Sequence, residues 1–166
     1  MKIRQATALD LPAIAAIYNH EILHGVATFD TTEWDERAAR QWFGKHNPAT
    51  RPITVAVDDR GEVLGWGSLS DWSTRCAYNR TAEDSFYVRP DHQGRGIGRL
   101  VMADLIERAR AIGVQVLLAR IETSCAASLH VHRAFGFRTI GVLRRVGEKF
   151  GRVLDVEMLE RSLEDD

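Results

Sequence analysis

The chain has 166 residues, of which 45% are hydrophobic and 27% charged, and its formal net charge at pH 7 is -1. This length and balance predict one globular domain over residues 1–166, and the near-neutral charge argues against nucleic acid as a partner. No apolar run reaches the roughly 20 residues that cross a bilayer and no secretory signal is recognisable, so we predict a cytoplasmic protein that binds no membrane.

Hydrophobic periodicity and turn residues predict a series of strands and helices with no domain break, which is a mixed α/β fold. In chain order, the predicted elements are a strand at 2–5, helices at about 11–21 and 33–46, strands at 53–57, 63–69 and 81–88, a helix that ends near 112, a strand at 114–121, a helix capped by Ser124 and ended by Gly136, and strands at about 138–146 and 152–159.

A glycine segment, Gln93-Gly-Arg-Gly-Ile-Gly-Arg99, lies between the strand that ends at Val88 and the next predicted helix. A helix N-terminus offers unpaired N–H groups and the positive end of a dipole, which suit a phosphate or a diphosphate. Glycine lets an anion approach the backbone, and Arg95 and Arg99 can pair with its oxygens. The P-loop pattern is absent. A dinucleotide site, with Glu122 near the expected distance for a ribose-binding acid, and a solvated glycine turn are the alternatives.

The string Gln-Gly-Arg-Gly-Ile-Gly, after a strand that ends in Tyr-Val, resembles the acyl-CoA motif Q/R-x-x-G-x-G/A of the GNAT superfamily of N-acetyltransferases. The resemblance implies that acetyl-CoA is the acetyl donor, with its pyrophosphate on the glycine segment and its pantetheine arm beside the preceding strand. The residues expected around acetyl-CoA in these two segments are Tyr87, Val88, Gln93, Gly94, Arg95, Gly96, Ile97, Gly98 and Arg99.

Further segments in family order extend the resemblance over about residues 3–158, to the branch that acetylates phosphinothricin and methionine sulfoximine. The resemblance implies a GNAT-type fold, in which a mixed, twisted sheet carries helices on both faces and splays between its two central parallel strands. It also implies a homodimer. The segments are Ile3-Arg-Gln-Ala-Thr7, Ile17-Tyr-Asn19, Gly65-Trp-Gly-Ser-Leu69, Tyr78-Asn-Arg-Thr-Ala-Glu83, Ser128-Leu-His-Val-His-Arg-Ala-Phe-Gly-Phe137 and Val146-Gly-Glu-Lys-Phe-Gly-Arg-Val-Leu-Asp155.

Glu83 is the candidate general base. Acetyl transfer to an amine has to remove a proton from the attacking group and stabilise the departing thiolate. Strand alternation places Glu83 on one face of the strand 81–88 and Asp84 on the other. A solvent-facing acid is the alternative interpretation. The branch carries a glutamate at this position in a Thr-x-Glu motif, so the resemblance implies that Glu83 acts as the base, directly or through water.

His132 is the candidate acid or thiolate-stabilising group. It shares a helix face with Ser128 at the i, i+4 spacing. Most of the superfamily has a tyrosine at this position, and this branch has a histidine. The alternative interpretation is a histidine on the helix surface without a role in catalysis. His130 and His132 cannot share a metal ion on a helix, and no other ligand spacing is present, so we predict no metal.

Cys125 stands where the family usually has asparagine, at the start of the helix that contacts the pantetheine. Together with Ser128 it is expected to contribute to the acetyl-CoA site. A cysteine near a helix N-terminus can have a lowered pKa, which raises covalent transfer through Cys125 as an alternative. Direct transfer is preferred, because the superfamily needs no covalent intermediate.

The polar loop before Glu83 and the C-terminal strands are expected to recognise the amine. Arginine binds a carboxylate through two hydrogen bonds, although loop arginines are more often solvated. The resemblance implies an amino acid with a tetrahedral, oxygen-bearing side chain, such as phosphinothricin, methionine sulfoximine or methionine sulfone. Another small amine, a peptide N-terminus, and a non-catalytic module that binds CoA or a nucleotide are the alternatives. The candidate substrate-binding residues are Phe29 and Trp72 as apolar walls, with Arg75, Tyr78, Arg80 and Lys149.

Overall fold

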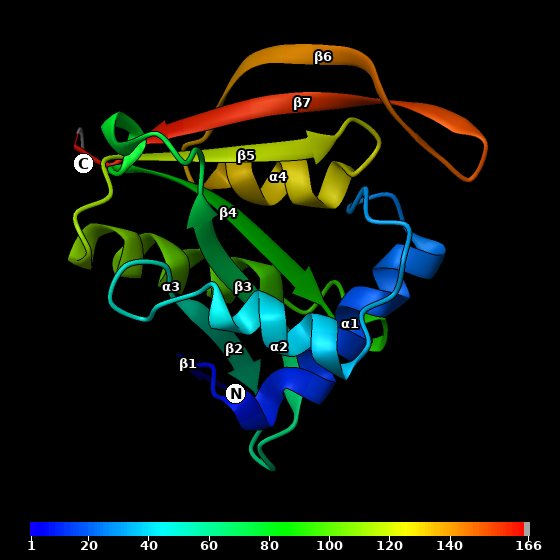
Figure 1. Cartoon of the computed structure of the whole chain (residues 1–166), viewed down its shortest axis with the longest axis vertical. Coiled ribbons are helices and arrows are strands. Elements are labelled where there is room, and N and C mark those ends of the chain that lie inside the picture. Colours follow the sequence, from blue (N-terminus) through cyan, green and yellow to red (C-terminus); the bar gives the residue numbers. More distant parts are fainter. Residues whose placement is uncertain (165–166) are drawn as a thin grey trace.

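The computed structural model describes residues 1–164, whose strands form one mixed sheet of seven strands in the order β1-β2-β3-β4-β5-β7-β6. Only β4 and β5 are parallel neighbours in this part of the chain, and the other pairs are antiparallel (Figure 1). The elements are β1 (Lys2–Gln5), α1 (Leu11–His24), α2 (Glu36–Gly44), β2 (Ile53–Val57), β3 (Val63–Asp71), β4 (Thr81–Val88), α3 (Ile97–Ala111), β5 (Val116–Glu122), α4 (Ala126–Ala134), β6 (Arg138–Lys149) and β7 (Arg152–Ser162).

Each face of the sheet has its own apolar core, because successive strand side chains point to opposite faces. On one face, Val101 and Leu105 of α3 pack with Leu117 of β5. On the other face, Ile14 of α1 packs with Trp66 of β3. The predicted arrangement of helices on both faces of a mixed sheet is therefore confirmed.

The sheet opens between β4 and β5. These strands pair only from Thr81 to Glu83 on β4, opposite 116–118 on β5. Beyond Glu83, β4 stays paired with β3 as far as Val88, and β5 stays paired with β7 as far as Glu122. Each strand follows its antiparallel partner, so the two parallel strands diverge, as Figure 1 shows. The predicted splay is confirmed.

Several element boundaries differ from the predictions for local reasons. The second helix begins at Glu36 rather than near 33, because the Asp35 side chain caps it by accepting a bond from the N–H of Ala38 at 2.7 Å. The helix α4 is not capped by Ser124, whose hydroxyl donates to the Glu122 carboxylate instead.

Positive backbone φ angles explain the end of α4 and an irregularity within β6. Gly136 ends α4 with a φ of 80°, and the N–H of Phe137 returns to the carbonyl of His132 at 3.1 Å, as the sequence predicts. The predicted strand 138–146 continues to Lys149, because Arg145, at a φ of 58°, forms an irregularity within the strand and does not end it.

Candidate active site

A cleft of about 680 Å³ lies between the C-terminal end of β4 and the first turns of α3 and α4, and α1 borders it as well. Arg95 is exposed and lies outside the lining of this cleft. The structure brings the other predicted acetyl-CoA residues together, and their contact with acetyl-CoA stays a prediction. The predicted residues that line the cleft are Tyr87, Val88, Gln93, Gly94, Gly96, Ile97, Gly98, Arg99, Cys125 and Ser128.

The glycines of this segment are required for two different reasons. Gly94 and Gly96 have φ angles of 74° and 80°, a left-handed conformation that favours glycine, although the space around an added Cβ would be open. Gly98 is required by packing, since its Cβ would lie 3.0 Å from the ring of Phe86. The resulting chain path ends in the first turn of α3, where Leu100 makes the first helical bond to Gly96. The preceding N–H groups are therefore free of helical partners.

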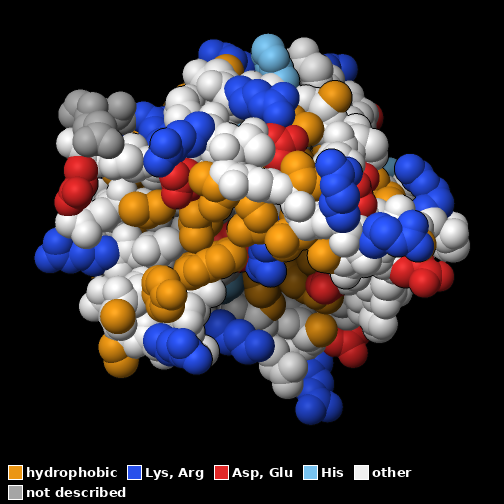
Figure 2. Space-filling model, turned by 90° about the horizontal axis from the view of Figure 1, so that it is seen from above, with side chains coloured by type: hydrophobic (Ala, Val, Ile, Leu, Met, Phe, Trp, Pro, Cys, Tyr) orange, Lys and Arg blue, Asp and Glu red, His pale blue; other side chains and the backbone are white. Residues whose placement is uncertain are grey.

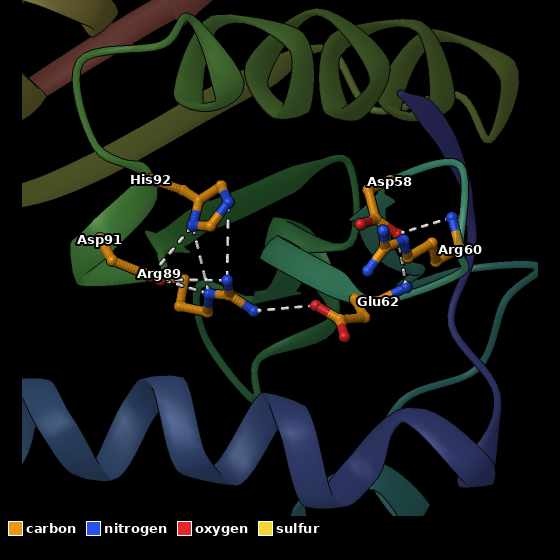
Figure 3. A network of polar contacts seen from close by, with 6 residues as sticks. All are labelled: Asp58, Arg60, Glu62, Arg89, Asp91 and His92. Atoms are coloured by element: carbon orange, nitrogen blue, oxygen red, sulfur yellow. Dashed lines mark hydrogen bonds and ion pairs between the residues drawn. The ribbon is translucent and has the colours of Figure 1, made fainter.

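Arg89 fixes the turn that joins β4 to the glycine segment. It donates to the two carboxylate oxygens of Asp91 at 2.7 and 3.0 Å, and it reaches Glu62 of the neighbouring hairpin at 3.5 Å (Figure 3). These carboxylates, Asp91 above all, raise the pKa of the Arg89 guanidinium. His92 lines the cleft and lies 3.0 Å from Asp91. The network thereby holds the turn Pro90–His92 in place ahead of α3.

Glu83 lies at the last position where β4 pairs with β5, and Arg120 of β5 covers its carboxylate. Arg120 donates from Nε and Nη2 to the two carboxylate oxygens, at 2.6 and 2.7 Å. The hydrogen bonds to Glu83 raise the pKa of Arg120. The guanidinium carbon of Arg120 also lies 5.7 Å from the ring centre of Trp72, within the range of a cation–π contact. The candidate base thus stands where the strands separate, in a two-pronged ion pair.

His132 is only 3% exposed, so the alternative of a histidine on the helix surface is wrong. Its Nδ1 lies 2.8 Å from the carbonyl oxygen of Ser128, and its Nε2 lies 3.0 Å from Oδ2 of Asp84. Burial lowers the pKa of His132, but the charge and hydrogen bond of Asp84 and the bond to Ser128 outweigh it, and the net pKa is raised. Since a carbonyl only accepts, Nδ1 carries a proton. The raised pKa and the acceptors at both ring nitrogens favour the imidazolium form, in which Nε2 donates to Asp84.

The His132–Asp84 pair lies behind the cleft and is connected to it by Ser128. A gap of about 50 Å³ between β4 and β5 is lined by Ser128, His132 and Arg120, among others. Ser128 lines both this gap and the cleft, and its Oγ lies 3.4 Å from Nδ1 of His132. Both ring nitrogens of His132 already face acceptors, so the geometry favours a thiolate-stabilising charge over a direct proton donor.

Cys125 has the opposite pKa shift from the one considered for a covalent route. Burial, followed by the negative charges of Glu122 and Glu21, raises the pKa of its thiol to about 11. The thiol therefore stays protonated at neutral pH and is a poor nucleophile. The lowered pKa considered for the covalent alternative is therefore not found at the start of α4, because burial first, and then the charges of the two carboxylates, disfavour the thiolate.

The predicted substrate-binding residues fall into different places. Trp72 lies beside the Glu83–Arg120 pair. Arg75 and Tyr78 are exposed on the loop before β4. Arg80 lines a separate cavity of about 530 Å³, at the end of β4 opposite to the cleft, so the structure does not bring it to Glu83.

Lys149 and Phe29 belong to the packing of the loop after α1. Lys149 is 4% exposed, and its Nζ donates to the carbonyls of Thr28 at 2.8 Å and Glu21 at 3.3 Å. Burial lowers the pKa of its ammonium. Phe29 packs on Gly147, where an added Cβ would lie 2.1 Å from its ring. Lys149 thus ties the loop to β6 and does not present a free charge.

Two residues of this site were missed by sequence reasoning, Arg120 and Asp84. Arg120 interrupts the apolar strand 116–122, and a charged residue inside such a run is a signal of a buried or paired site. Asp84 was assigned only a strand face. Its Oδ1 is buried without a hydrogen-bond partner in the described part of the chain, which marks it as an unusual core acid.

No helix within residues 1–164 is both long and apolar enough to cross a membrane. The same residues contain no group of three or more His, Cys, Asp and Glu side chains placed to hold a metal ion. The absence of a metal from the reaction stays a prediction.

Known proteins resemble this chain in sequence and in fold. The acetyltransferase (GNAT) family matches residues 14–137. An L-methionine sulfoximine/L-methionine sulfone acetyltransferase from Pseudomonas paraeruginosa strain PA7 is 42% identical over 98% of this chain and 94% of that protein. A phosphinothricin N-acetyltransferase from Alcaligenes faecalis is 39% identical over 93% of this chain and 78% of that protein.

A solved structure agrees with these relatives. The crystal structure of a GNAT superfamily phosphinothricin acetyltransferase from Sinorhizobium meliloti, in complex with AcCoA, matches with a TM-score of 0.93 and 35% identity, over 97% of this chain and 87% of that one. The splayed sheet, the cleft at the start of α3 and these matches lead to one conclusion: the chain belongs to the acetyltransferase (GNAT) family.

Proposed function

We propose that the protein transfers the acetyl group of acetyl-CoA directly to the α-amino group of a small amino acid of the phosphinothricin, methionine sulfoximine or methionine sulfone type. The observation that carries this proposal is the position of Glu83, which is half-buried where β4 and β5 separate. Its partner Arg120 lines the gap between these strands, and Ser128 lines both this gap and the cleft. The names of the relatives support the choice of substrate.

The cleft fits acetyl-CoA. Its volume and its free N–H groups at the first turn of α3 suit a diphosphate, and Arg99 adds a positive charge at the same turn. Gln93 and the edge of β4 at Val88 supply polar backbone and side-chain groups for the rest of the donor. When bound, acetyl-CoA supplies the activated acetyl group.

The proton and charge steps are assigned to side chains of this chain. Glu83 accepts a proton from the substrate ammonium, directly or through water, and thereby frees the lone pair that attacks. The His132 imidazolium, with Ser128 between it and the cleft, stabilises the negative charge that develops on the departing sulfur. Trp72 forms an apolar wall beside Glu83.

A homodimer is part of the proposal. Its support is β6, an edge strand on which apolar side chains are exposed, among them Ile140 at 51% and Val146 at 52%. Figure 2 shows hydrophobic side chains gathered on the face of the molecule that carries β6 and β7. A long, apolar edge strand is normally covered in solution. Light scattering at micromolar concentration tests this assignment, and a monomer contradicts it.

We also propose that the reaction uses no metal ion, that the protein binds neither nucleic acid nor membranes, and that it acts in the cytoplasm. The net charge of -1 supports the absence of nucleic-acid and membrane binding. Activity that survives exhaustive chelation supports a reaction without metal, and activity lost to a chelator and restored by one metal contradicts it.

Release of free thiol from acetyl-CoA tests the function. The panel contains phosphinothricin, methionine sulfoximine, methionine sulfone, ordinary amino acids, a polyamine and a peptide N-terminus, compared by kcat/KM. We expect one of the first three compounds to give the highest value. A polyamine or a peptide that exceeds all three overturns the substrate class and leaves acetyl transfer intact. Binding of acetyl-CoA without amine-dependent thiol release in any arm supports the non-catalytic alternative.

A further inference from the structure

We propose that Arg120 is a specificity-determining residue, which binds the carboxylate of the amino-acid substrate after leaving Glu83 to the substrate ammonium. This inference rests on the proposed function and deepens it, because it names the group that selects a zwitterionic amino acid over a cationic amine. In the structure, Arg120 instead pairs with Glu83, through Nε and Nη2 at 2.6 and 2.7 Å from its two carboxylate oxygens.

The two partners of the pair differ in exposure. The Glu83 side chain is 14% exposed, whereas that of Arg120 is 56% exposed. Arg120 uses Nε and Nη2 for Glu83, and its Nη1 has no hydrogen-bond partner among residues 1–164. The Glu83 carboxylate is therefore the inner partner of the pair, and the Arg120 guanidinium is the outer partner, with N–H donors that Glu83 does not use. Arg120 keeps a donor group available for a second anion, whereas Glu83 needs another cation wherever Arg120 moves away from it.

The charges of the pair match those of an amino acid. A zwitterion brings an ammonium group for Glu83 and a carboxylate for Arg120, so its binding converts one internal ion pair into two ion pairs. A polyamine or another cationic amine offers a partner to Glu83 alone. It would leave Arg120 without an anion and place two positive charges next to each other. The pair therefore disfavours the wrong substrate as well as binding the right one.

The position of Arg120 also suits this role. The α-amino and α-carboxylate groups of an amino acid are attached to one carbon atom, and Glu83 and Arg120 are in direct contact. Arg120 lines the gap between β4 and β5 with Ser128 and His132, so a carboxylate held by Arg120 keeps the amine at Glu83 and beside that gap. The contact with Trp72, 5.7 Å from the guanidinium carbon, limits how far the arginine can move.

The test compares two substrates that differ only in the carboxylate, methionine sulfone and its carboxamide, in the wild type and in Arg120→Gln. We expect the wild type to prefer the acid. In Arg120→Gln the KM for the acid should rise at least about tenfold, while the KM for the carboxamide stays within about twofold. Arg138→Gln is the matched control, because Arg138 is an exposed arginine on β6 that pairs with Glu160 at 2.5 Å. The control should leave both KM values unchanged.

A purely structural role for Arg120 gives a different result. If Arg120 only holds Glu83 in place, Arg120→Gln changes kcat for both substrates by the same factor and leaves their ratio unchanged, which overturns the inference. Arg120→Lys keeps the charge without the two-pronged geometry, so it should lose part of the preference for the acid over the carboxamide. Thermal unfolding shows whether each variant is folded.

Binding without turnover provides an independent readout. Calorimetric titration of methionine sulfone into enzyme saturated with CoA should give an affinity at least about tenfold weaker for Arg120→Gln than for the wild type. Equal affinities overturn the inference even when the variant is inactive. A wild type that binds no methionine sulfone and acetylates only a cationic amine overturns the inference and the proposed substrate together. An active wild type with an unchanged acid preference in the variant overturns the inference alone.

Discussion

The glycine segment before α3 and the Glu83–Arg120 pair between β4 and β5 differ in what fixes their geometry. At the glycine segment the backbone carries the site: Gly94 and Gly96 hold left-handed angles, and the donors are N–H groups. At the ion pair, two side chains 37 residues apart carry the site, and the backbone only brings their strands together. The first region should therefore fail when its φ angles are disturbed, and the second when a single charge is removed.

The largest effect is expected from Glu83→Gln, which removes the basicity of the side chain and keeps its size and an acceptor for Arg120. We predict that kcat falls about 10²-fold or more at neutral pH, because the amine keeps its proton. Steady-state kinetics with methionine sulfone measure this fall. Glu160→Gln, which removes a paired carboxylate on β7, is the control and should keep wild-type turnover. Turnover of Glu83→Gln at the wild-type rate would remove Glu83 from the mechanism.

Asp84→Asn should show that the His132 imidazolium stabilises the fold. The pKa of His132 is raised in the folded protein, so its stabilising contribution is fully present below the ordinary value of 6.5 and is lost as the pH rises through the raised value. We expect the wild type to exceed the variant by about 2 kcal/mol in the free energy of unfolding at pH 5 to 6.

Denaturant titrations of wild type and Asp84→Asn over pH 5 to 9 measure this difference. It should shrink as the pH rises past the titration of His132. A difference that stays constant over the whole range would mean that His132 is neutral in the fold.

Gly96→Val tests the backbone region. A β-branched residue at a φ of 80° is strained, and the first turn of α3 has to move. The KM for acetyl-CoA should rise about tenfold, with little change in the KM of the amine. Gly113→Val is the matched control: Gly113 has a φ of 78° and equally open space, but it ends α3 away from the cleft. Gly113→Val should lower stability and leave the KM for acetyl-CoA unchanged. An equal rise of this KM in both variants would mean that general strain, and not the acetyl-CoA site, causes the effect.

The smallest effect is expected from Cys125→Ala. With a thiol pKa of about 11, Cys125 is protonated at neutral pH, so the variant should keep kcat within about twofold of the wild type. Double-reciprocal plots should intersect for both proteins. Parallel lines in the wild type, together with an inactive variant, would restore the covalent route.

The same contrast explains what could be predicted from the sequence. The glycine segment and the strands 53–57 and 81–88 are local patterns, and their predicted bounds agree with the structure. The pairing of Glu83 with Arg120 depends on which strands become neighbours and on their register, which no local pattern contains. Lys149 is a residue for which the sequence predicts a function that the structure does not support. Its charge indicates substrate binding, but tertiary packing buries it under the loop after α1.

Two separate regions carry the proposed reaction: the start of α3 holds acetyl-CoA, and Glu83 deprotonates the amine. One measurement tests it most directly: equilibrium binding of acetyl-CoA, by calorimetry, to the wild type and to Glu83→Gln, with kcat determined on the same preparations. We predict equal acetyl-CoA affinities and a kcat about 10²-fold lower in the variant. A variant that loses acetyl-CoA affinity in proportion to its activity, or that keeps its full kcat, would contradict the account.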